Sequence, residues 1–186
     1  MVEVKVRQKY QGLSRQELLD KAYELGFNFE KYSQSCSQCT VAALHELVEM
    51  DDAIVRAASS SAGGQLAQVV GTCGGLIGGT MVLDYFFGRP ADKMSHEEGI
   101  PGNGKLQMDA MQVANPLFFK YIEEYGTIIC PQIHMKLFGR HYYILDKDEM
   151  EKFEAAGGHT TKCTKVVGTA ARWTMEILLD KGAIKL

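Results

Sequence analysis

The sequence has no marked excess of charge and no apolar run long enough to cross a bilayer. Its 186 residues include 20 Lys and Arg against 23 Asp and Glu, a formal net charge of -3. So small an excess gives no reason to expect nucleic acid or an anionic membrane as partner. The most apolar stretch, residues 69–83, contains five glycines and stops at Asp84. Because a membrane-spanning helix needs ~20 apolar residues, we expect no membrane span.

The sequence also lacks a secretory signal at its beginning. Residues 1–19 contain no apolar segment followed by a small-residue cleavage site. We therefore expect a cytoplasmic protein. Thiols stay reduced in that compartment, so the five cysteines are expected to be metal ligands or reactive thiols rather than disulfides.

Proline is scarce, and apolar residues recur at helical spacing along most of the chain. The expected fold is all-α: one domain over residues 1–186, with a core at about 14–182 and about six to eight helices. A capping box formed by Ser14 and Glu17 starts the first helix, which Gly26 is expected to end.

The remaining segments follow from the same rules, with one long loop among them. Residues 88–105 are rich in Gly, Pro and charge and are expected to be a loop insertion. A helix from about residue 106 should bend or break at Asn115 and Pro116. Residues 142–145 form the one β-like patch. Further helices are expected at 37–48, after Asp51 or Asp52, from the glycine-rich segment at 71–75, and at 131–138, 150–156 and 161–180.

Four of the five cysteines stand at the expected start of a helix. These are Cys36, Cys73, Cys130 and Cys163. Free N–H groups and the partial positive charge at a helix N-terminus stabilise a thiolate or an anionic metal–sulfur centre. A single buried cysteine more often only fills space. The same setting repeated four times favours a functional role.

The fifth cysteine, Cys39, forms a CxxC motif with Cys36. Such a pair is compatible with a redox dithiol, half of a zinc site or part of an iron–sulfur site. There is no second CxxC for a zinc ribbon. Thr40 stands where covalent haem attachment needs His.

Glycines gather around Cys73, where each costs a helix ~1 kcal/mol relative to alanine. Two explanations carry equal weight: close approach of the backbone to a bulky centre, or close packing of helices. A phosphate-binding loop is a poor alternative, because no Lys followed by Ser or Thr is present. The candidate cofactor-binding glycines are Gly71, Gly74, Gly75 and Gly78.

Two histidines lie four residues from a cysteine. His134 follows Cys130 and His159 precedes Cys163 at that distance. Either could be a ligand or a proton carrier. A packing role is favoured for each.

The order and spacing of these motifs resemble a family of small redox-active proteins named for a C_GCAxxG_C_C pattern. The resemblance spans roughly residues 14–180. Its elements are SCSQ at Cys36, CGGLIG at Cys73, Cys130 followed by LFG, and Cys163 at the head of the last helix. The chain departs from the pattern in two ways: Gly75 replaces the usual Ala, and Cys39 is an addition. The resemblance implies a bound redox centre, inferred to be iron–sulfur, in proteins often associated with oxidoreductase or transport functions. It implies no particular reaction.

The first hypothesis is therefore an iron–sulfur protein with a [2Fe–2S] or [4Fe–4S] cluster. Candidate metal ligands are Cys36, Cys73, Cys130 and Cys163, with Cys39 as a substitute ligand or neighbour. It would transfer electrons alone or as a subunit of a larger oxidoreductase, with a redox partner protein, and a homo-oligomer stays open. Three alternatives remain: a thiol-based redox enzyme or sensor with a low-pKa cysteine such as Cys73, a structural zinc domain, and cysteines that only pack.

Overall fold

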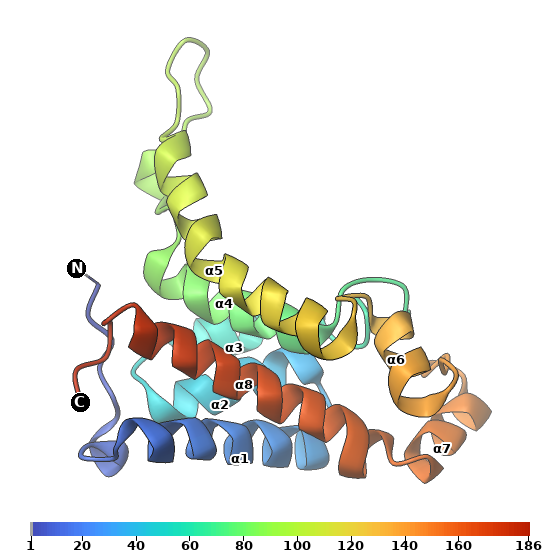
Figure 1. The fold of residues 1–186 in the computed structure, drawn as a ribbon. Helices are drawn as coiled ribbons and strands as arrows, with labels where there is room; N and C mark the ends of the chain where they lie inside the picture. The colour runs from blue at the N-terminus through green and yellow to red at the C-terminus, as the bar shows by residue number, and fades with distance from the viewer. Residues whose placement is uncertain (1) are drawn as a thin grey trace.

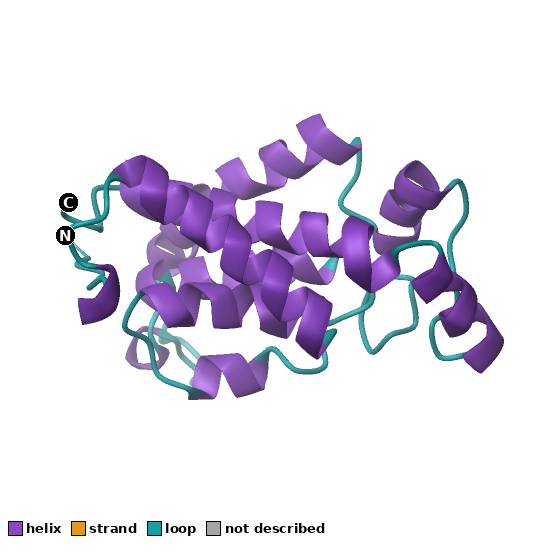
Figure 2. Ribbon diagram, turned by 90° about the horizontal axis from the view of Figure 1, so that it is seen from below, coloured by secondary structure: helices purple, strands orange, loops and turns teal. Residues whose placement is uncertain are grey.

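The computed structural model describes residues 2–186, and within them every regular element is a helix (Figure 2). The all-α prediction is thus confirmed. The helices are α1 Arg15–Ser33, α2 Cys36–Leu47, α3 Ala53–Ala57, α4 Gly74–Phe87, α5 Gly104–Tyr125, α6 Cys130–Phe138, α7 Lys147–Ala155 and α8 Cys163–Asp180. Shorter turns are η1 Gln8–Tyr10, η2 Ala91–Lys93 and η3 Gly158–Lys162, the last with π-helical hydrogen bonding.

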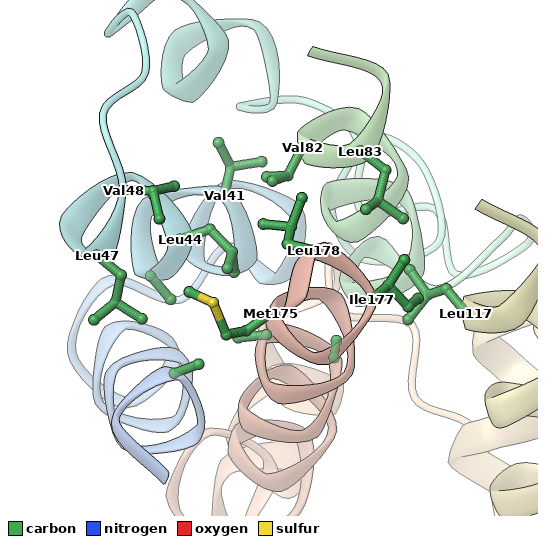
Figure 3. Packing of buried hydrophobic residues seen from close by; sticks show 14 of the residues in the cluster. Val41, Leu44, Leu47, Val48, Val82, Leu83, Leu117, Met175, Ile177 and Leu178 are labelled. Carbon is green, nitrogen blue, oxygen red and sulfur yellow. The ribbon is translucent and has the colours of Figure 1, made fainter. Parts of the chain in front are cut away.

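The last helix is the centre of the bundle. Helix α8 packs against α1, α2, α4 and α5, which lie around it (Figure 1). Its buried face supplies Met175, Ile177 and Leu178, which meet Leu44 of α2 and apolar side chains of α4 and α5 (Figure 3). Each such side chain, fully buried, contributes ~1.5–3 kcal/mol to stability, so this cluster holds the bundle together.

Helix α1 begins as the sequence predicts and continues past the predicted end. The Ser14 hydroxyl accepts a hydrogen bond from the Glu17 N–H, and the Glu17 carboxylate accepts one from the Ser14 N–H. The expectation that Gly26 ends the helix is wrong. Gly26 is buried against α8, where an added Cβ would stand 2.9 Å from the Val167 carbonyl oxygen. The glycine lets two helices approach closely rather than ending one of them.

At Asn115 and Pro116, where a bend or a break is expected, helix α5 is not broken, and Figure 1 shows that it changes direction along its length. A proline inside a helix removes one hydrogen bond and costs ~3 kcal/mol or more. Leu117 and Tyr121, just after it, are completely buried against the bundle. Their burial outweighs the cost of the proline. The helix starts at Gly104, capped by the Asn103 side chain.

The predicted loop at 88–105 joins the ends of α4 and α5, with only the short turn η2 inside it. Figure 1 shows these helix ends and the loop projecting as an arm from one end of the bundle. No helix within residues 2–186 is long and apolar enough to span a membrane.

The β-like patch at 142–145 forms no strand. Tyr142 is buried in an aromatic cluster with Phe138, Phe153 and His134. This segment has no neighbouring strand to supply hydrogen bonds, and the aromatic contacts decide its course instead. Together with α6 and α7 it closes the end of the bundle opposite the chain termini (Figure 1).

Candidate functional site

Four cysteines from distant parts of the sequence line one cavity of about 230 Å³. Cys36, Cys130 and Cys163 are the first residues of α2, α6 and α8, and Cys73 is the N-cap of α4. The prediction that these four cysteines stand at helix starts is thus confirmed. The fold thus brings together four cysteines that share the same local position, the start of a helix.

Cys39 lies outside this group. It is 2% exposed and is not part of the cavity wall. Residues three apart on a helix lie on neighbouring parts of its surface, yet only Cys36 is at the N-terminus facing the cavity. Cys39 points into the contact with α1, near Glu30. The CxxC motif thus places one thiol at the cavity and one in the helix packing.

The glycines near Cys73 allow close packing against different partners at different positions, and the approach of a bound centre stays a prediction. A Cβ on Gly74 would collide with the Cys36 sulfur, so this position needs glycine to admit the thiol. At Gly75 a Cβ would lie 2.6 Å from the Tyr121 hydroxyl, and at Gly78 it would collide with the Ser37 carbonyl. Those two positions allow α5 and α2 to pack closely. The Gly71 carbonyl accepts a hydrogen bond from the Cys130 N–H at 2.8 Å, which ties two cysteine segments together.

Backbone N–H groups point at two of the sulfurs. The Gly63 N–H donates to Cys36 Sγ at 3.3 Å. At Cys73, the N–H groups of Gly75 and Leu76 favour the thiolate, and the Tyr121 hydroxyl lies 3.9 Å from the sulfur. Donors of this kind stabilise negative charge on sulfur and raise the reduction potential of a sulfur-bound centre.

Burial nevertheless raises the pKa of every cysteine in the chain. It is the largest cause at each one, and it raises the pKa of Cys39 to about 12. The pKa of Cys73 is raised as well, despite its N–H donors. An activated nucleophile needs a lowered thiol pKa. A low-pKa Cys73, the basis of the thiol-enzyme alternative, therefore has no support in this environment.

His134 faces two of the cavity cysteines. Its Nε2 lies 3.9 Å from Cys130 Sγ and 4.0 Å from Cys163 Sγ. Burial lowers its pKa to about 4, so the ring is neutral at pH 7. The ring stacks on Phe153, and its buried Nδ1 has no hydrogen-bond partner in the described chain. His134 therefore packs in the aromatic cluster, as expected, and also lies beside two of the cavity cysteines.

Glu30 is a site residue that the sequence reasoning missed. It is 2% exposed, lines the cavity, and its Oε2 has no partner among residues 2–186. Burial raises its pKa to about 7, against the opposing effect of His159. A signal existed: Glu30 continues the i+4 series Leu18, Ala22, Gly26, which is the buried stripe of α1. The expectation that α1 ends at Gly26 hid it.

His159 connects Glu30 with the surface. Its Nε2 is 3.8 Å from Glu30 Oε1, and its Nδ1 is 2.5 Å from Oε1 of Glu154, whose side chain is one-third exposed. His159 lies in the π-helical turn before α8, and such turns often occur at functional sites. The cavity is therefore lined by the ionisable side chains of Glu30 and His159 as well as by the four cysteines.

A strained segment passes over the cavity. Gly63 and Ala67 are part of the cavity wall, and the intervening backbone is left-handed. Left-handed backbone costs a residue with a side chain ~1–2 kcal/mol. The non-glycine residues with positive φ here are Gln65, Leu66, Ala67 and Val69. Four residues with unfavourable backbone conformations therefore lie in the segment that forms part of the cavity wall.

The spacing of the candidate ligands bears on what the cavity could hold. Within residues 2–186, no three Cys, His, Asp or Glu side chains lie close enough to hold a single metal ion. The four cysteines line a cavity of about 230 Å³ together with Glu30, His134, His159 and apolar residues such as Ile133 and Val166. Four thiolates are the usual ligand set of an iron–sulfur cluster.

Comparison with known proteins agrees with this cysteine arrangement. Residues 34–177 match the model of the family described as "Putative redox-active protein (C_GCAxxG_C_C)". Searches of curated proteins and of solved structures give no significant match. Because the family match covers most of the chain, the chain belongs to this redox-active family.

Proposed function

We propose that this member of the redox-active family binds an iron–sulfur cluster and functions in electron transfer, alone or as a subunit of a larger oxidoreductase. The ligands would be the thiolates of Cys36, Cys73, Cys130 and Cys163. The observation that carries the proposal is that these four thiols, from four helix starts, line one cavity.

The surroundings of the thiols support a metal-bound state. Burial raises the pKa of all four, so thiolates there need a compensating positive charge. Metal ions supply that charge and deprotonate coordinating thiols. A cluster bound there would supply a reversible redox centre whose potential depends on hydrogen bonds and solvent exposure. The N–H groups near Cys36 and Cys73 and the apolar residues of the cavity wall would set this potential.

The placement of Cys39 makes a matched test available. Cys73→Ala and Cys39→Ala remove the same group from two buried positions, one at the cavity and one outside it. For chains purified without oxygen, we expect iron and acid-labile sulfide in equal amounts and a visible absorption band. Cys39→Ala should retain both, and Cys73→Ala should lose most of the iron.

Two controls keep this test interpretable. Helix content by circular dichroism shows whether Cys73→Ala has folded, and Cys130→Ala repeats the test at a second helix start. A native chain that stays colourless after anaerobic reconstitution with iron and sulfide would overturn the proposal. Equal loss of iron in Cys39→Ala would overturn the ligand assignment.

A further inference from the structure

We propose that the outer face of α5 is a homodimer interface, on which a second copy of the chain packs with its own α5 antiparallel. The face is defined by Met108, Met111, Phe118, Phe119 and Ile122 and is called here the α5 stripe. It lies outside the cavity and does not depend on what the cavity binds.

Helix α5 is apolar on two sides, and the bundle covers only one of them. Its inner side buries Ala110, Leu117 and Tyr121. The α5 stripe is 37–60% exposed, with Phe119 at the upper end of that range. Figure 1 shows α5 along an edge of the molecule, with α4 and α8 on its inner side. Met and aromatic residues are typical of protein interfaces, so this second apolar side indicates a partner.

The spacing of the α5 stripe fits another helix. Positions 108, 111, 115, 118 and 122 are separated alternately by three and four residues, which is the repeat of helices packed side by side. Asn115, at the midpoint, is exposed and polar. If Asn115 lies opposite its own equivalent, an antiparallel copy places Met108 opposite Ile122 and Met111 opposite Phe119. The stripe is therefore complementary to itself, as a two-fold interface requires.

The charges at the two ends of α5 support the same orientation. Lys105 lies just before the α5 stripe, and Glu123 and Glu124 lie at its far end. Neither glutamate forms an ion pair within residues 2–186, while Lys105 pairs only with Asp109 of its own helix. An antiparallel copy brings each lysine end towards the glutamate end of its partner. A parallel copy would place like charges together, which disfavours that alternative.

The area of the α5 stripe is compatible with a specific dimer. Side chains of this size can bury ~150–250 Å² each, so the exposed parts of the five amount to roughly 500 Å² per copy. Two copies would bury roughly 1,000 Å² from the stripe alone. Flanking polar residues would add to this area, and specific interfaces begin at ~1,200 Å².

The first test is the molar mass in solution, by light scattering after gel filtration and by sedimentation. We expect the native chain to be a dimer at micromolar concentration. Phe119→Lys and Met111→Lys should each weaken the dimer at least tenfold. Tyr32→Lys is the matched control, because Tyr32 is more exposed than any residue of the stripe and lies on α1. Its dimer should be unchanged.

The second test examines the orientation. Asn115→Cys should cross-link two chains under mild oxidation, since the two-fold axis brings this residue near its equivalent. Met108→Cys alone should not, whereas Met108→Cys mixed with Ile122→Cys should. The native chain, whose cysteines are away from the stripe, is the control.

A monomeric native chain would overturn the proposal, and so would one whose α5 stripe binds only a different protein. A dimer that Phe119→Lys and Met111→Lys leave intact would place the interface on another face. Efficient cross-linking of Met108→Cys with itself would overturn the antiparallel orientation. All of these readouts are independent of iron, so they are separate from the test of the proposed function.

Discussion

The centre of the bundle and its cysteine end differ in whether their buried polar groups are hydrogen-bonded. Around α8, most buried side chains are apolar, and the buried Thr174 hydroxyl donates a hydrogen bond to the Ala170 carbonyl. At the cysteine end lie Glu30 and His134, each with a buried polar atom that has no hydrogen-bond partner among residues 2–186, and Thr164 beside Cys163 is a third such residue. Unpaired buried polar groups cost ~1–3 kcal/mol each. The buried residues of the centre therefore stabilise the fold, whereas the unpaired buried polar groups at the cysteine end reduce its stability.

The largest expected effect belongs to the centre. Leu178→Ala removes a side chain with no exposed surface and should cost about 2–5 kcal/mol, because the transfer free energy is lost and a cavity remains. Denaturant unfolding measures the change, and Leu145→Ala, at an exposed position, should cost well under 1 kcal/mol. Equal costs for the two variants would remove the contrast between the regions.

Glu30→Gln examines the cost of the site itself. The pKa of Glu30 is raised from 4.5 to about 7 in the folded chain, so the folded state binds the proton more tightly than the unfolded state. The contribution of Glu30 to stability is then greatest below pH 4.5, falls as the pH rises to about 7, and is level above that. The Gln variant lacks this fall. At pH 8 it should be more stable by about 2–3 kcal/mol, and the gain should vanish near pH 4.

Unfolding free energies between pH 4 and pH 8.5 check this profile. Glu151→Gln, at an exposed position of α7, is the control and should follow the native curve. A Glu30→Gln variant less stable than the native chain at pH 8 would show that the carboxylate is stabilising after all.

Gly26→Ala tests the corrected course of α1. The new Cβ would press on the Val167 carbonyl and the Gly168 Cα of α8, and a backbone cannot move aside as a side chain can. We expect a loss of about 1–2 kcal/mol despite the better helix propensity of alanine. Gly104→Ala is the helical control, because no atom of the described chain outside its own helix backbone and chain neighbours lies within 4 Å of an added Cβ. It should be neutral or slightly stabilising, and a neutral Gly26→Ala would contradict the close packing of α1 and α8.

The smallest expected effect is at the strained segment. Leu66 has φ +52° and a 58% exposed side chain, so Leu66→Gly relieves the backbone and gives up little packing. We expect a gain of about 0.5–1 kcal/mol, the relief less the entropy of glycine in the unfolded chain. Denaturant unfolding is again the measurement. The exposed residue Leu145, with ordinary backbone, is the control position, where Leu145→Gly should give no gain.

Much of the fold could be predicted, since helix signals are local. The capping box at Ser14, the proline at the start of α6 and the cysteines at helix starts depend on neighbours within one turn. The predictions that were wrong concern Gly26 and residues 142–145, and of the two outcomes expected at Pro116 the break does not occur. At each of them, contacts with distant residues outweighed the local preference. Glu30 was missed for the same reason, because only the full length of α1 places it at the cavity.

The sequence alone determined the candidate residues: five thiols, four of them at helix starts, with glycines beside one. Tertiary structure decided which thiols meet. It brought Cys36 to the cavity and turned Cys39 away, although both belong to one CxxC motif. The physical reason is that a helix start is a local property of the chain. A shared cavity, by contrast, depends on how α2, α4, α6 and α8 pack, and that packing is set by apolar surfaces far apart in the sequence.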